Sequence, residues 1–266
     1  MEQQQLDKLR EWFDGFVDSF YGNDEYVNAN LKMKQLHSLR TCEKMLYLVD
    51  QLGLDANQRR IAEAIALLHD VGRFVQFVEY RTYNDARSTN HSQLSVEVLQ
   101  KAGILDTIED SQRQYIEDAI RYHGLKELPS DLHGQALFYS KLIRDADKLD
   151  ALHVVIENFI EYNSDPEKFI LEVELPDVPQ YSQEVLDSIL LGKRIDYRRL
   201  ETWNDMKLCF LGWVYDVNFV ATLKRIKEKR FLETLFDFLP NDDNIAMVRE
   251  KIFDFVDAAI ERENRQ

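Results

Sequence analysis

Glycine and proline are scarce along this chain, and their scarcity limits the folds that it can adopt. Only 9 glycines and 5 prolines occur among 266 residues, so few positions suit the tight turns that a multi-stranded sheet needs. Apolar residues instead recur every three or four positions, as Leu6, Leu9, Phe13, Phe16 and Phe20 do, which is typical of an amphipathic helix. The sequence therefore predicts an all-α protein built from long helices.

The same periodicity locates the individual helices. The expected helical segments are 5–21, 31–52, 55–71, 91–103, 107–122, 135–161, 182–191, 200–228, 229–239 and 243–262. The third of them is expected to stop at Gly72, because glycine commonly ends a helix. The segment 73–90 is rich in arginine, tyrosine and small polar residues, so we expect an irregular loop there.

Residues 163–182 interrupt the helical pattern, and three of the five prolines fall among them. We expect a helical core over residues 1–162 and a helical extension over residues 163–266 packed on it, with one continuous domain as the alternative. The stretch FILEVEL at residues 169–175 alternates apolar and polar positions, so a short strand is possible there.

Charge limits the partners that the chain can bind. The formal net charge is -15, and such a surface repels nucleic-acid polymers and anionic membranes. A small phosphorylated substrate is still compatible, because a local cationic site outweighs the overall field. Cys42 and Cys209 are far apart and are expected to be reduced, and we see no signal peptide and no membrane-spanning run. These features predict a cytoplasmic protein.

The stretch AEAIALLHDVGRF is the first candidate for chemistry. His69 continues the apolar face of Ile61 and Ile65, and Asp70 continues a neighbouring face of alanines. A buried carboxylate beside a buried imidazole needs a partner, and a divalent cation can bind both. A His–Asp hydrogen bond inside the core is the alternative interpretation.

A second candidate lies in LIRDADKLDALHVV. Asp147 falls between Ile143 and Ala151 on a mostly apolar helical face. Asp145 and Asp150 on neighbouring faces compete for the same role, and a solvated charge cluster is the alternative interpretation.

A third candidate is His37 in QLHSLR. His37, the His69–Asp70 pair and Asp147 lie on three separate expected helices, and a helical bundle can bring such side chains together. Two imidazoles and two carboxylates form a mixed nitrogen and oxygen set that suits Mn, Fe, Zn, Ni or Mg.

The order of these segments identifies a known family. With the pattern H…HD…D and the stretches HDVGRF, NHSQLSVEVL, AIRYHG and RDADKLDAL, residues 30–160 resemble the HD superfamily of metal-dependent phosphohydrolases. The resemblance implies an HD-type helical bundle and a divalent metal ion held by His37, His69, Asp70 and Asp147. It also implies cleavage of a phosphoester or phosphoanhydride bond in a small, nucleotide-like substrate.

Two further histidines match the family. In binuclear members, histidines at the places of His91 and His123 bind a second metal, and the HD aspartate bridges the two ions. This chain has His123-Gly124 where the cyclic-dinucleotide phosphodiesterases have a His-His pair, and it lacks their GYP signature. We therefore expect one firmly held ion, with two as the alternative, and we expect His91 and His123 otherwise to contact the scissile phosphate.

The chemistry needs fixed cations beside the phosphate, because negative charge accumulates there during the reaction. Arg73 follows the HD pair and Lys148 follows Asp147, so these two residues are predicted to bind the substrate and to assist catalysis. Asp70 is predicted to orient a metal-bound water in addition to binding the metal. Phe77, Tyr80 and Tyr83 are predicted either to stack on a base or to cover the core.

Two other function classes stay open from the sequence. Some relatives of the superfamily hold a di-iron site on the same scaffold and oxidise a C–H bond, so an oxygenase is one alternative. A non-catalytic signalling or interaction module is the other, although the intact set of candidate ligands argues against it. The residues name neither the substrate nor the oligomeric state.

Overall fold

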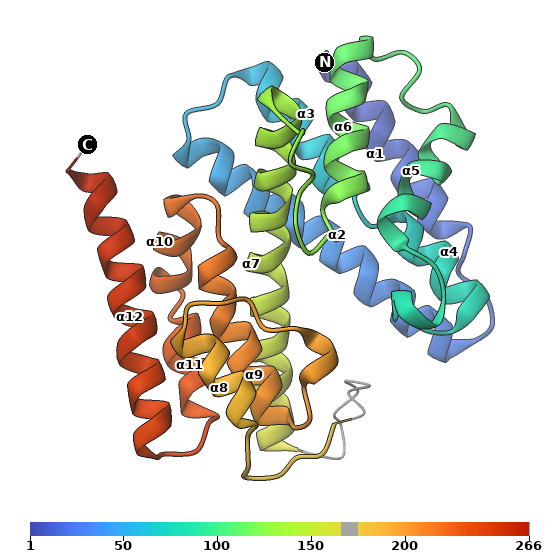
Figure 1. The fold of residues 1–266 in the computed structure, drawn as a ribbon. Coiled ribbons are helices and arrows are strands. Elements are labelled where there is room, and N and C mark those ends of the chain that lie inside the picture. Colours follow the sequence, from blue (N-terminus) through green and yellow to red (C-terminus); the bar gives the residue numbers. More distant parts are fainter. Residues whose placement is uncertain (166–174, 266) are drawn as a thin grey trace. The chain divides into compact units, whose positions relative to one another are not determined.

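The computed structural model describes residues 1–165 and 175–265, and these residues form helices and no strands (Figure 1). The predicted all-α fold class is therefore confirmed. Residues 169–174 of the possible short strand lie outside the described residues. The chain divides into two compact units, Met1–Asp150 and Ala151–Gln266. The predicted division near residue 162 stays a prediction, and the two units are described separately below.

The first unit is a bundle around a core of apolar helix faces. Its helices are α1 (Gln3–Asp18), α2 (Glu25–Gln51), α3 (Ala56–Leu68), α4 (Val71–Tyr80), α5 (His91–Ala102), α6 (Asp110–Tyr122) and the first half of α7 (Gly134–Ser164). Helix α3 is the central element, because it packs against α1, α2 and α6. Its residues Ala62, Ile65 and Leu68 are fully buried, which explains the apolar stretch that precedes the HD pair in the sequence.

Helix α4 differs from the sequence-based expectation of a loop after Gly72. The chain bends at Asp70, with φ -109° and ψ 16°, and a new helix begins at Val71. Val71, Phe74 and Phe77 are buried on one face of this helix, and burial of these residues outweighs the polar character of the segment. Only residues after α4 form the irregular loop.

Gly72 does not end a helix but allows two helices to touch. A Cβ atom at this position would lie 2.5 Å from the carbonyl oxygen of His91 and 2.6 Å from the backbone nitrogen of Ser95. Only glycine therefore lets α4 approach the start of α5 so closely. The contact matters for function because both helix starts carry candidate site residues.

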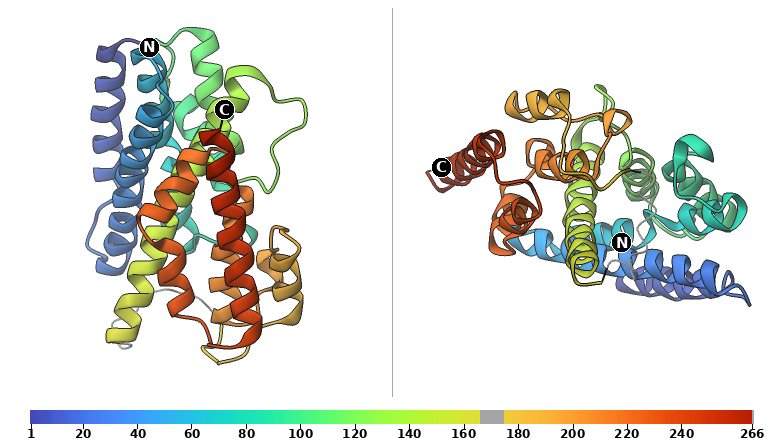
Figure 2. Two further views of the ribbon diagram at one scale, coloured as in Figure 1. Left: turned by 90° about the vertical axis from the view of Figure 1, so that its left-hand side faces the viewer. Right: turned by 90° about the horizontal axis from the view of Figure 1, so that it is seen from below.

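The second unit consists of the end of α7 and five further helices. These are α8 (Gln183–Leu190), α9 (Trp203–Gly212), α10 (Val220–Glu228), α11 (Phe231–Asp237) and α12 (Asp243–Asn264). The expected continuous helix over 200–228 is wrong, because a short 3-10 turn at Trp213–Asp216 separates α9 from α10. Helix α12 packs against α8 and α10 (Figure 2), and its buried face includes Val248 and Ile252.

Within the described ranges, none of the helices combines the length and the apolar character that a membrane crossing demands.

Candidate metal centre

The HD pair lies at the junction of α3 and α4. His69 caps the C-terminus of α3, and its Nδ1 lies 2.8 Å from the carbonyl oxygen of Ala66. A carbonyl oxygen only accepts, so Nδ1 carries the hydrogen and a neutral ring presents the lone pair of Nε2 to the interior. Asp70 precedes α4 without capping it, and its carboxylate is buried. The bend between the two helices thus aims both side chains into the bundle.

His37 approaches the pair from the middle of α2. Its Nε2 lies 3.3 Å from Nε2 of His69 and 3.1 Å from Oδ1 of Asp147 on α7. On the other side of the ring, Nδ1 lies 2.7 Å from Oδ2 of Asp150. Arg40 donates to both oxygens of Asp150, at 2.8 and 3.2 Å. Asp150 therefore orients the ring from behind, whereas Asp147 faces the other histidines.

His91 and His123 form a second histidine pair. Their Nε2 atoms lie 3.1 Å apart. His91 begins α5, and its Nδ1 lies 2.6 Å from Oδ2 of Asp85. His123 caps α6, and its Nδ1 lies 2.7 Å from the carbonyl oxygen of Ile120. Acceptors behind both rings again leave the Nε2 atoms facing inward.

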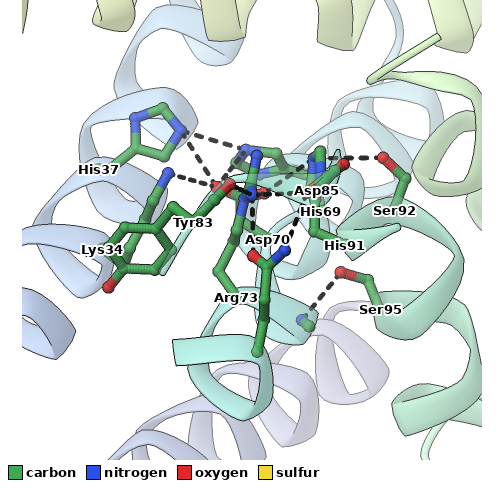
Figure 3. Close-up of polar contacts among 12 residues, drawn as sticks. Lys34, His37, His69, Asp70, Arg73, Tyr83, Asp85, His91, Ser92 and Ser95 are labelled. Atoms are coloured by element: carbon green, nitrogen blue, oxygen red, sulfur yellow. Dashed lines mark hydrogen bonds and ion pairs between the residues drawn. The ribbon is translucent and has the colours of Figure 1, made fainter. Parts of the chain in front are cut away.

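Asp70 faces His37 and His69 with one carboxylate oxygen and His91 and His123 with the other. Figure 3 shows Asp70 among His37, His69 and His91. Its Oδ2 is 3.6 Å from Nε2 of His37 and 3.8 Å from that of His69. Its Oδ1 is 3.7 Å from Nε2 of both His91 and His123. We call His37, His69, Asp147 and Oδ2 of Asp70 the first half-site. We call His91, His123 and Oδ1 of Asp70 the second half-site.

The donor atoms are close enough to share cations. Among the described residues, three groups of donors that could hold a metal ion have all their ligand atoms within 4.8 Å of one another. One group belongs to the first half-site, one is the second half-site, and the third joins His69, His123 and Asp147 across them. Asp145, the other candidate carboxylate, is buried but belongs to none of these groups.

The second half-site fits a cation because its carboxylate oxygen lacks a hydrogen-bond donor in the part of the chain that the structure describes, although the Ser92 hydroxyl lies 3.2 Å from Nε2 of His91. Oδ1 of Asp70 is buried and accepts no hydrogen bond from the described residues. The Nε2 atoms of the two facing imidazoles each lie 3.7 Å from that oxygen. A divalent cation at this position would coordinate the buried carboxylate oxygen together with the nearby Nε2 atoms. The residues present therefore fit a metal ion.

The ionisation states of the site follow from burial and neighbouring charges. Burial lowers the pKa of both His69 and His91, in each case to about 4. Burial also acts to lower the pKa of His37, but hydrogen bonds to Asp147 and Asp150 outweigh it and raise this pKa to about 9. Burial acts to raise the pKa of Asp70, yet the charge of Lys34 leads the effects that hold it well below the usual value.

The predicted basic residues occupy different places around this cluster. Nη1 of Arg73 donates to Gln76 Oε1, to the carbonyl oxygen of Tyr83 and to Asp85 Oδ1, at 2.8, 2.6 and 2.9 Å. Its Nε lies 3.6 Å from Oδ1 of Asp70. Lys148 is half-buried next to Asp147 on α7. Arg73 thus borders the second half-site. Lys148 comes directly after Asp147, which belongs to the first half-site.

Phe77 and Tyr83, two of the three aromatic residues that could stack on a base, pack against each other. Tyr83 stacks on the buried Phe77 with ring centroids 4.6 Å apart, and its hydroxyl donates to the carbonyl oxygen of Asn30 at 3.0 Å. The core-covering alternative therefore describes these two residues. Tyr80 is exposed.

Sequence reasoning missed Lys34 and the supporting role of Asp85. Lys34 lies one turn before His37 on α2, and a spacing of three residues places both side chains on the same face of the helix. This spacing could have indicated that Lys34 belongs to the site. Asp85 lies in a short 3-10 turn after α4, where no periodicity indicates which way a side chain points. Their partners show that both belong to the site.

The matched family agrees with this geometry. Residues 36–152 match the family model of the HD domain. These residues form an HD domain. The domain begins one residue before His37 and ends two residues after Asp150, so it contains every residue of both half-sites. The resemblance inferred from the sequence is confirmed. Comparisons with curated proteins and with solved structures gave no match.

Proposed function

We propose that this HD domain is a metal-dependent phosphohydrolase that cleaves a phosphoester or phosphoanhydride bond in a small phosphorylated compound. The convergence of four imidazoles and two carboxylates carries the proposal, since donor groups from α2, from the α3–α4 junction, from α5, from α6 and from α7 meet around His69 and Asp70. Each imidazole has an acceptor behind Nδ1, which is the usual arrangement of a metal-binding histidine.

The proposed ligands divide between two ions. His37, His69, Asp147 and Asp70 would hold the first ion. His91, His123 and Asp70 would hold a second, and the unsatisfied Oδ1 of Asp70 supports that second ion. Nitrogen-rich donors without a thiolate favour Mn, Fe, Ni or Zn over Mg.

The side chains would then divide the chemical work. A bound divalent cation would lower the pKa of a coordinated water and polarise a phosphoryl oxygen. Asp70 would orient that water, while Arg73 and Lys148 would contact the phosphoryl oxygens as negative charge develops. Asp147 is the most exposed of the six proposed ligands, with 32% of its side-chain surface accessible. Substrate would therefore approach from the side of Asp147 and Lys148.

The proposed substrate is small and nucleotide-like rather than a polymer. The net charge of -15 disfavours nucleic acids and anionic membranes as partners. A cytoplasmic location is part of the proposal as well, and the free thiols of Cys42 and Cys209 are consistent with it. Local cations at Lys34, Arg73 and Lys148 offset the overall charge for a single phosphate group.

Metal analysis followed by a substrate screen tests this function. We expect the purified protein to contain a transition metal, to lose hydrolytic activity after chelation and to regain it with added metal. The screen covers nucleoside mono-, di- and triphosphates and simple phosphoesters, with Asp70→Asn as the control for contaminating phosphatases. Hydrolysis at the same rate in wild type and Asp70→Asn, or a wild-type protein that binds no divalent metal, would refute the proposal.

One observation also favours a di-iron oxygenase as a second candidate. A carboxylate shared between two half-sites is as suitable for two iron ions as for two hydrolytic ions. Two irons per chain with substrate-dependent consumption of dioxygen, and no phosphate release from any compound in the screen, would decide for the oxygenase.

A further inference from the structure

Lys34 places an ammonium group inside the first half-site. Its Nζ lies 3.0 Å from Oδ2 of Asp70, and the same oxygen faces His37 and His69 (Figure 3). The side chain of Lys34 is only 17% accessible. The ammonium therefore contacts the very oxygen that a metal ion in this half-site would use.

An ammonium and a divalent cation that contact the same carboxylate oxygen compete for it, because each is attracted to the same negative charge and the two cations repel each other. Lysine only donates, so Lys34 cannot serve as a ligand itself. Like charges a few ångströms apart repel strongly in a buried site, where solvent screens them poorly. Metal binding at Oδ2 thus favours movement of the ammonium away from that oxygen.

Lys34 is suited to such a movement, whereas Arg73 on the other side of Asp70 is not. Nη1 of Arg73 makes three hydrogen bonds with the protein. Among the described residues, the structure pairs Lys34 with one carboxylate, that of Asp70, and its Nζ lies 5.2 Å from the ring centroid of Tyr83. A flexible four-carbon stem lets the ammonium shift by a few ångströms while the aromatic face keeps it near the site.

We propose that Lys34 exchanges partners: it neutralises Asp70 in the metal-free site and, once a metal ion has displaced it, binds the phosphoryl group of the substrate. This inference rests on the proposed function. It assigns Lys34 two opposite effects, since the ammonium competes with the metal and assists the phosphate. No covalent step is involved, because only ion pairs are exchanged.

The exchange predicts that loss of the charge shifts two affinities in opposite directions. In Lys34→Met, metal binding to the metal-free protein tightens by about tenfold or more, because the competing cation is gone. Binding of inorganic phosphate to the Mn²⁺-loaded protein weakens by about tenfold or more, because a charged hydrogen-bond donor is lost. General damage to the fold weakens both affinities and cannot produce this pair of shifts.

The experiment measures Mn²⁺ affinity by competition with a chromophoric chelator and phosphate affinity by calorimetry on the loaded protein. Lys34→Arg keeps the charge and is expected to retain phosphate binding within a few fold of wild type. Lys32→Met is the matched control, because Lys32 is an exposed lysine of the same helix that contacts Gln35 instead. It is expected to behave as wild type in both measurements.

Each outcome has a defined meaning. Unchanged or weaker Mn²⁺ binding in Lys34→Met overturns the exchange, and so does unchanged phosphate binding. The same shifts in Lys32→Met would assign the effect to overall charge and would also overturn it. A wild-type protein that binds no metal would refute the proposed function and this inference together. If wild type binds metal and Lys34→Met has the same Mn²⁺ and phosphate affinities as wild type, the exchange of partners by Lys34 is refuted and the proposed function is not.

Discussion

The Nε2 atoms of His91 and His123 lie 3.1 Å apart, although both rings direct their Nδ1 atoms at acceptors on the opposite side. Asp85 and the carbonyl oxygen of Ile120 accept hydrogen bonds from those Nδ1 atoms, so the two Nε2 atoms face each other. Oδ1 of Asp70 lies 3.7 Å from both. A cation at this position would be coordinated by both imidazoles and by the shared carboxylate.

Asp70→Asn is expected to reduce hydrolysis of any identified phosphate substrate by about 100-fold or more. The amide keeps the shape of the carboxylate but removes the charge that both half-sites share. Circular dichroism should still report a helical protein, because Asp70 caps no helix by a hydrogen bond. Full activity in this variant, with metal supplied, would place the chemistry elsewhere.

His123→Gln is expected to lower the metal content from two ions per chain toward one. The second half-site has no carboxylate besides the shared Asp70, whereas the first also has Asp147. Loss of one imidazole should therefore empty the weaker half-site first. Elemental analysis after dialysis checks the stoichiometry. His133→Gln is the control, because His133 is exposed and contacts only backbone in the described residues, and an equal loss in that variant would contradict the assignment.

Asp85→Asn is expected to weaken activity, or affinity for the second ion, by about 10- to 100-fold. Burial acts to raise the pKa of Asp85, but the hydrogen bond to His91 outweighs it and lowers this pKa to about 2. The carboxylate is thus ionised and holds the hydrogen on Nδ1 of His91. An amide can present its NH₂ group instead and favour the wrong tautomer. Metal titration with Asp110→Asn as an exposed control measures the effect, and wild-type affinity in Asp85→Asn would exclude this role.

The metal-free protein is expected to lose stability as the pH rises from about 6.5 to about 9. The pKa of His37 is raised from 6.5 to about 9 in the folded protein. A raised pKa contributes stability that is fully present below 6.5 and is lost as the pH passes through 9. The free energy of unfolding should fall by roughly 1–3 kcal/mol across this window. Urea titrations of metal-free wild type and metal-free His37→Gln measure this change. In the variant, the free energy of unfolding should stay constant between pH 6.5 and 9.

Gly72→Ala is expected to destabilise the protein by about 1–3 kcal/mol, because the added Cβ meets backbone atoms that cannot yield without moving α5. Gly15→Ala is the matched control on α1, where nothing lies within 4 Å of an added Cβ. That change should stabilise the helix by about 0.5–1 kcal/mol. Thermal unfolding of both variants shows whether stability falls in Gly72→Ala and rises in Gly15→Ala. A Gly72→Ala protein as stable as wild type would show that α4 and α5 can separate without cost.

Much of the candidate site could be predicted from sequence because its signals are local. Helical spacing put His37 and Asp147 inside helices, and the apolar face of α3 pointed to His69 and Asp70 at its end. A short motif and a period of about 3.6 residues need no knowledge of distant contacts. The error at α4 was of the same local kind, since glycine ends many helices but here serves a close contact between two.

Only the tertiary structure decided which atoms face one another. Asp150 and Asp147 are one turn apart on α7, yet one supports His37 from behind and the other faces the candidate metal position. Lys34 reaches Asp70 across 36 residues, and Arg40 reaches Asp150 across 110. Such pairings depend on how buried helix faces pack, and helical periodicity limits a side chain to a face without naming its partner. The sequence by itself thus determined the helical fold class, most of the helices and most of the site's residue types. The packing of α2 and α7 around the α3–α4 bend decided the charges and contacts of the site.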